Sequence, residues 1–212
     1  MLKYIILTLL ISYCDYLSAQ IIVSSENGAM VRLAPDGSWE EVKLQEPDRG
    51  KVRLFMIPAN ATNIIEGYNK RFSISYNEEK WYAYRSTEVL ADGRNAMVLQ
   101  FAHRDGDAIG VVTADSVTLS PKHVIYRSLQ EIRQKSTAFN VAYGEVFNVN
   151  NHIIYMVIIQ VTQKGIPITY YNYYYSDEVG SYELLTYCNQ NAFDTFEDDF
   201  KDLLNGFETY LK

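Results

Sequence analysis

The run His103-Arg104-Asp105-Gly106-Asp107 brings an imidazole and two carboxylates close together around one predicted turn. On a regular strand, alternation would place positions 103, 105 and 107 on one side of the chain. One histidine and two carboxylates suit Mn²⁺ or Zn²⁺, so His103, Asp105 and Asp107 are the candidate metal ligands of this sequence. The alternative is a plain hairpin in which Asp105 and Gly106 serve turn geometry, and that alternative implies no cofactor.

A second unusual feature is a run of tyrosines at positions 170, 171, 173, 174 and 175. On a strand, Tyr171, Tyr173 and Tyr175 share one face, while the other two share the opposite face. Stacked aromatic rings that also hydrogen-bond suit a sugar or a protein partner, so Tyr171, Tyr173 and Tyr175 are the candidate binding residues. The alternative is that tyrosine, a favoured strand residue, packs here under helices.

No catalytic residue is predicted. The carboxylates of Asp194, Glu197, Asp198 and Asp199 stand at the start of a predicted helix, where negative charge stabilises the helix dipole. Cys188 lies in an alternating run, which indicates burial in a sheet. The sequence contains no G-x-S-x-G elbow, P-loop, G-x-G-x-x-G loop, H-E-x-x-H or CxxC motif, so nucleotide, zinc-protease and thiol-redox functions lack support.

The composition bounds the function further. The chain has 212 residues, is 48% hydrophobic and carries a formal charge of −7. This is the composition of a globular domain, and an acidic surface does not attract phosphate backbones, which argues against nucleic-acid binding.

The first 19 residues are typical of a secretory signal. Lys3 is followed by the apolar run 4–13, and the small residues Ser18 and Ala19 precede Gln20. We expect cleavage after Ala19 and a periplasmic or secreted mature protein without an integral membrane span. The alternative is a lipoprotein anchored through Cys14, against which bulky Tyr13 argues.

Turn signals after the signal segment predict a small N-terminal β-meander over residues 20–45. Asn27-Gly28 and Asp36-Gly37 separate three short β-type runs. Pro47, Asp48 and Gly50 mark a linker over residues 46–59, and the main domain then occupies residues 60–212.

The main domain alternates hairpin-connected strands with two helices. We expect strands at 72–76, 96–103, 108–119, 139–143, 152–162, 166–176 and 182–188. Ser120 followed by Pro121 predicts a helix of about 14 residues, and Asp194 with Glu197 predicts a capped final helix.

That order of elements predicts an α+β fold with an antiparallel β-sheet. The run 153–161 is apolar on both faces, which requires a covering layer on each side of its strand. We therefore predict helices on both faces, an α/β/α sandwich, with the final helix lying on this sheet through its apolar stripe. The stripe is formed by Phe196, Phe200, Leu203, Leu204, Phe207 and Leu211.

Several segments resemble a family of uncharacterised exported bacterial proteins with the PsbP-like fold. They are the runs 101–108 and 165–174, the pair Val149-Asn150, and Leu203-Leu204-Asn205-Gly206-Phe207. The resemblance covers roughly residues 60 to 210 and implies a fold used mainly for binding and assembly, as in the photosystem II subunit PsbP and a nuclear-transport cofactor. Since fold does not fix function, no photosynthetic role and no catalytic set is carried over.

Together these observations predict an exported, non-enzymatic binding or assembly protein of the bacterial cell envelope with a protein partner. The alternative is an envelope hydrolase that acts on glycan or ester substrates through polar residues dispersed in the sequence.

Overall fold

The computed structural model describes residues 21–24, 30–33, 39–41, 54–67, 70–89 and 95–210. The expected signal segment 1–19 and Cys14 lie outside the described residues. The chain forms two compact units, Met1–Val42 and Lys43–Lys212.

The first unit contains a three-stranded antiparallel sheet with the order β1-β2-β3. Its strands are β1 (Ile21–Ser24), β2 (Met30–Leu33) and β3 (Trp39–Glu41). They lie where the turn signals predict a meander.

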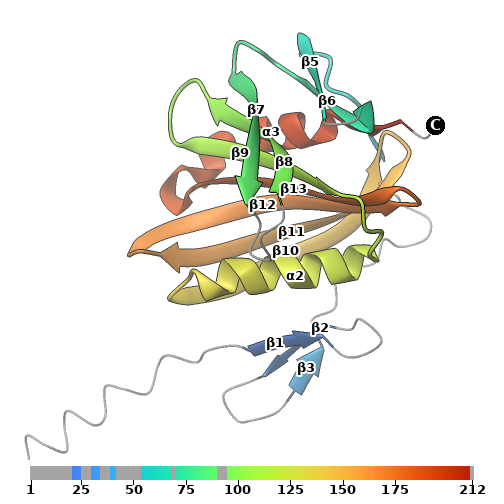
Figure 1. Ribbon diagram of the computed structural model, residues 1–212. Coiled ribbons are helices and arrows are strands. Elements are labelled where there is room, and N and C mark those ends of the chain that lie inside the picture. The colour runs from blue at the N-terminus through green and yellow to red at the C-terminus, as the bar shows by residue number, and fades with distance from the viewer. Residues whose placement is uncertain are drawn as a thin grey trace, which may run out of the picture. The chain divides into compact units, whose positions relative to one another are not determined.

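An eight-stranded sheet with the order β4-β10-β11-β12-β13-β9-β8-β7 dominates the second unit (Figure 1). All of its neighbouring strands are antiparallel except β4 and β10, which run parallel. The strands are β4 (Leu54–Phe55), β7 (Trp81–Val89), β8 (Asn95–His103), β9 (Ala108–Asp115), β10 (Ala138–Val149), β11 (His152–Gln163), β12 (Ile166–Asp177) and β13 (Gly180–Asn189). The sheet is therefore mixed rather than purely antiparallel, and β4 falls within the expected linker.

Tight turns set the register of the long hairpins. Asn150 and Asn151 adopt positive φ angles of 48° and 69° between β10 and β11. Gly165 has a φ of 81° between β11 and β12, and Gly106 has a φ of 112° between β8 and β9. Glycine and asparagine are the residues that reach this region at least cost, so the predicted hairpins close where the sequence places them.

A second, three-stranded sheet has the order β14-β6-β5. It consists of β5 (Asn63–Glu66), β6 (Phe72–Tyr76) and β14 (Phe207–Thr209). Every residue of β6 is buried. Gly206 lets β14 approach β6, because an added Cβ there would lie 1.8 Å from the Ser75 carbonyl oxygen.

Helix α2 (Pro121–Gln134) forms as the sequence predicts, with Ser120 as N-cap and Pro121 at its first position. The Ser120 side chain accepts the His123 backbone N–H. Its buried apolar stripe is Val124, Ile125, Leu129 and Ile132, and it packs on β12 and β13.

Helix α3 (Phe193–Asn205) differs from the prediction at both ends. Its N-cap is Ala192 without a side-chain hydrogen bond, because a 3-10 turn, η2 (Gln190–Ala192), capped by Asn189, leads into it. The predicted capping box at Asp194 is thus wrong. Phe207 belongs to β14 rather than to the helix, and Leu211 lies outside the described residues.

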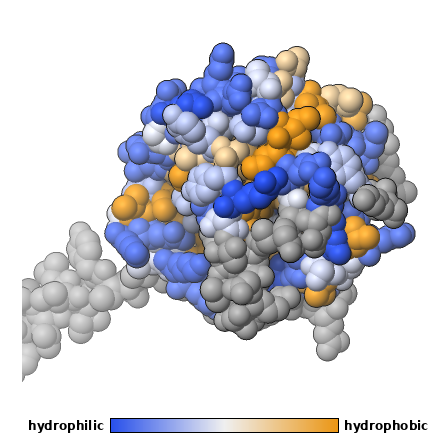
Figure 2. Space-filling model, turned by 45° about the horizontal axis from the view of Figure 1, so that its top comes forward, coloured by the Kyte–Doolittle hydropathy of each residue, from blue (hydrophilic) through white to orange (hydrophobic). Residues whose placement is uncertain are grey.

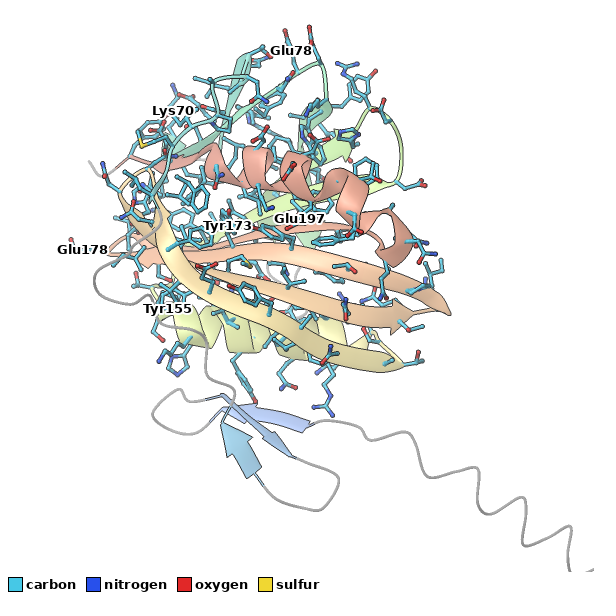
Figure 3. All side chains as sticks on the ribbon, turned by 180° about the vertical axis from the view of Figure 1, so that it is seen from behind. Lys70, Glu78, Tyr155, Tyr173, Glu178 and Glu197 are labelled. Atoms are coloured by element: carbon cyan, nitrogen blue, oxygen red, sulfur yellow. The ribbon has the colours of Figure 1, made fainter. Side chains whose placement is uncertain are left out.

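The two helices contact opposite sides of the eight-stranded sheet, as seen from behind in Figure 3. Tyr173 of β12 points towards α3, and Tyr155 of β11 lies on the α2 side. In the part of the domain that the structure describes, each side carries one helix, and α3 also packs on β6 of the small sheet. The architecture is therefore mostly sheet, and the predicted α+β class holds more fully than the predicted sandwich with helical layers. Neither helix within the described ranges is long and apolar enough to span a membrane.

The buried face of α3 should carry much of the stability. Phe200 is fully buried and packs near Trp81, Phe193 and Phe196. Phe200→Ala should lower the free energy of unfolding by about 3–5 kcal/mol, because a large core ring leaves a cavity. Thr195→Ala, an exposed position of the same helix, is the matched control and should change it by less than about 0.5 kcal/mol. Urea denaturation measures both, and equal effects would show that α3 is an appendage.

Candidate functional site

The candidate binding tyrosines lie on the α3 side of β12, where the core covers them. Tyr171 and Tyr173 are 3% and 1% exposed, and Tyr175 is partly buried. Tyr171 and Tyr173 are thus placed as in the alternative, in which tyrosine packs under helices. Their rings pack against Phe193 and Phe147, respectively, so neither offers a free face to a ligand.

The phenol hydroxyls of β12 instead bond neighbouring elements. Tyr173 donates to Oδ1 of Asn205 at the end of α3, at 3.0 Å. Tyr174, on the opposite face, lies 2.9 Å from the Ser128 hydroxyl of α2, and Tyr175 lies 3.1 Å from His152 Nδ1. Burial raises the pKa of Tyr171 to about 12 and that of Tyr173 well above its ordinary value, so these phenols stay protonated.

The structure does not assemble the candidate metal ligands. His103 is 6% exposed and points inward, where its Nε2 lies 3.1 Å from Asp199 Oδ2. Its Nδ1 accepts the Asp105 backbone N–H at 3.2 Å, so the ring donates to Asp199 through Nε2. The side chains of Asp105 and Asp107 are exposed on the β8–β9 turn. Among the described residues, no group of three or more His, Cys, Asp or Glu is placed to hold a metal ion.

Asp199 of α3 contacts the residue before β7 and the last residue of β8. One carboxylate oxygen accepts from His103 of β8, and the other pairs with the Lys80 ammonium before β7. The hydrogen bond to Asp199 raises the pKa of Lys80. Trp81, which follows Lys80, is 2% exposed. Its ring packs edge-on to the His103 ring, with the ring centroids 4.9 Å apart.

This anchoring turns alternate residues of β7 outward. Trp81 points into the core, whereas Tyr82 and Tyr84 are 55% and 49% exposed. Arg104 places its guanidinium 3.6 Å from the centroid of the Tyr82 ring. The Arg104 Nε also donates to the Glu78 carbonyl oxygen at 2.7 Å. We name Tyr82, Tyr84 and Arg104 the β7 outer surface.

Two exposed aromatic rings beside a fixed guanidinium are well suited to contact a protein. Tyrosine and arginine are enriched among the residues that dominate binding energy at interfaces. Because the backbone and Tyr82 both hold Arg104, little side-chain freedom remains to be lost on binding. On the face seen in Figure 2, hydrophobic residues lie among hydrophilic ones, with one group of them near the middle.

Sequence reasoning missed this surface because it assigned no strand to residues 81–89. The alternation of Trp81, Tyr82, Ala83 and Tyr84 was the available signal. Period-two patterning marks a strand, but only the structure tells which of its two faces is buried.

The cysteine and the other two histidines, which could act in catalysis, each make contacts within the fold. Cys188 is 2% exposed, and burial raises the pKa of its thiol to about 11. His152 lies against Tyr175, and burial lowers its pKa. The remaining histidine, His123, has its Nδ1 2.6 Å from the Ser120 hydroxyl at the start of α2.

The sheet order and the placement of its helices define a PsbP-like fold. The solution structure of cyanobacterial PsbP (CyanoP) from Synechocystis sp. PCC 6803 matches with a TM-score of 0.53 and 11% identity, over 73% of this chain and 95% of that one. A Bacteroides thetaiotaomicron structure matches at 0.49 and 9%, over 72% and 50% of the two chains. A Pseudomonas aeruginosa protein of unknown function matches at 0.45 and 8%, over 71% and 98%. No protein-family model and no curated protein matches the sequence.

The Asp199 contacts should be structural. Asp199→Ala removes the acceptor of the buried His103 Nε2–H and the partner of Lys80. We expect a loss of about 1–3 kcal/mol in the free energy of unfolding, since a buried donor is left unsatisfied. Asp198→Ala, whose side chain is 96% exposed, is the matched control and should change it little. Chemical denaturation of both variants decides, and equal stability would mean that Asp199 does not anchor β7.

Proposed function

We propose that this chain is an exported, non-enzymatic binding or assembly protein of the bacterial cell envelope. The observation that carries the proposal is the β7 outer surface, where Tyr82 and Tyr84 are about half exposed beside Arg104. Large aromatic rings left open to water gain free energy when a partner covers them. The partner in this proposal is a protein that lies across β7.

The state of the ionisable residues supports a binding function over catalysis. Both ring nitrogens of His103 hold hydrogen bonds, and the Cys188 thiol is protonated at neutral pH. A general base or a nucleophile needs a free, reactive atom within reach of a substrate. These side chains serve packing instead.

The two helices also support a finer description of the domain as an α/β/α arrangement. Ser128 of α2 and Asn205 of α3 bond adjacent tyrosines that point to opposite faces of β12. In this arrangement both broad faces of the central strands are covered, which leaves the outer face of β7 as the surface for a partner.

One contact favours the alternative of an envelope hydrolase. The Ser120 hydroxyl lies 2.6 Å from His123 Nδ1, which is the pairing of a nucleophile and a base. The same hydroxyl oxygen accepts the His123 backbone N–H at 3.4 Å, and Pro121 provides no N–H to an oxyanion. We therefore interpret Ser120 as a helix cap.

Substitution of the exposed tyrosines tests the proposed surface. A photo-crosslinker at Ser86 should capture a discrete envelope protein, and Tyr82→Ala with Tyr84→Ala should reduce that capture at least tenfold, because two interface anchors are lost. The melting temperature should stay unchanged. Tyr143→Ala, another exposed tyrosine, is the matched control and should retain capture. Unchanged capture in the double variant, or turnover of glycan or ester substrates that Ser120→Ala abolishes, would contradict the proposal.

Export is tested separately at the N-terminus. The order of a basic residue, an apolar run and small residues supports cleavage after Ala19, so native protein from the periplasm or medium should begin at Gln20. N-terminal sequencing and intact mass measure this directly. An intact Met1 on cytosolic protein contradicts export, and a lipid on Cys14 means membrane anchoring instead.

A further inference from the structure

A partly buried carboxyl group faces helix α2, away from the β7 outer surface. Glu183 of β13 is flanked by Tyr174 of β12 and by Thr113 of β9, on the sheet face that α2 covers. Its side chain hydrogen-bonds Ser128 of α2, and the same Ser128 hydroxyl lies 2.9 Å from the Tyr174 hydroxyl. Helix and sheet therefore meet through a small polar network inside an otherwise apolar contact.

The network continues into the sheet and leaves little freedom for rearrangement. Asn172 Nδ2 donates to the Tyr174 hydroxyl at 3.3 Å, and Asn172 Oδ1 accepts the Thr186 backbone N–H at 3.2 Å. Ser128, Tyr174 and Asn172 are all nearly fully buried. A charge that forms at Glu183 must be accommodated within these fixed partners or be exposed to water.

The charges around Glu183 partly cancel. The Ser128 hydrogen bond, Arg127 and Lys135 favour its ionised form, whereas Glu131 on the same helix disfavours it. Arg127 also forms an ion pair with Asp115 of β9, with 3.2 Å between its guanidinium nitrogen and the Asp115 Oδ2. The phenol of Tyr174, which pairs with Glu183 across β12 and β13, stays protonated because burial raises its pKa. Desolvation is the largest effect and raises the pKa of Glu183 from 4.5 to about 7.

We propose that Glu183 makes α2 a pH-responsive cover of the β12–β13 face, closed while the carboxyl is neutral and loosened when it ionises. The Ser128 hydroxyl donates to the carboxyl in the closed state, but burial under the helix disfavours its charge, which water solvates fully only when the helix lifts. Lifting exposes the apolar stripe of α2 and the opposite sheet face. The chain thereby gains a second apolar surface near neutral pH, which goes beyond the binding function proposed for β7.

The sign of the pH dependence follows from the raised pKa. Below about pH 4.5 the carboxyl is neutral in both the closed and the open helix, so pH has no effect. Between that value and about pH 7 the open state loses its proton first, so the opening constant rises by up to about tenfold per pH unit. Above pH 7 both states are ionised and the dependence ends.

Native-state hydrogen exchange across pH 4.5 to 8 tests this mechanism. After correction for the intrinsic rate of exchange, the opening constant of α2 amides should rise by up to about 300-fold and level off near pH 7. Glu183→Gln should remove this rise and keep α2 closed. Glu178→Gln, an exposed carboxyl on the turn between β12 and β13, is the matched control and should leave the rise unchanged.

Two results would overturn the proposal. One is a wild-type profile that Glu183→Gln leaves unaltered. The other is an equal rise for α2 and for the amides of β11, because that would place the effect of Glu183 in global unfolding rather than in the movement of one helix.

Discussion

The buried phenol hydroxyls of β12 are the constraint on which the rest of the domain depends. On a strand covered on both faces, a tyrosine hydroxyl left without a partner costs about 1–3 kcal/mol, because it loses its hydrogen bonds to water. Tyr173 finds Asn205 of α3, Tyr174 finds Ser128 of α2, and Tyr175 finds His152 of β11. Three consecutive residues therefore fix two helices and a neighbouring strand against the sheet.

That arrangement determines which surfaces remain for function. Because α2 and α3 pack against the central strands, Tyr171, Tyr173 and His103 are buried. They make contacts within the core and are not available to bind a ligand or a metal. The edge strand β7 is anchored from within through Trp81 and Asp199, and its outward residues are the exposed aromatic ones. The same covering of β13 places Glu183 where its charge depends on the position of α2.

The sequence predicts the parts of the fold that local physics determines. The Ser120-Pro121 start of α2, the Asp105-Gly106 turn and the long hairpins all lie where expected, because caps and turns need particular residues at particular positions. The sequence did not predict strands whose formation depends on pairing with residues far away in the chain. Strand β14 exists because Gly206 fits against Ser75, and β4 exists because it reaches β10. Alternation assigns the tyrosines to two faces, but whether each face is buried depends on the layers that cover it, and no local pattern encodes those layers.

A double-mutant cycle tests most directly whether the tyrosine hydroxyls hold the helices. Tyr173→Phe and Asn205→Ala should couple by about 0.5–1.5 kcal/mol in the free energy of unfolding, and so should Tyr174→Phe and Ser128→Ala. The crossed pair, Tyr173→Phe with Ser128→Ala, lies on opposite faces and should be additive. Additivity of all three pairs would contradict the account, because the hydroxyls would then contribute nothing to the attachment of either helix.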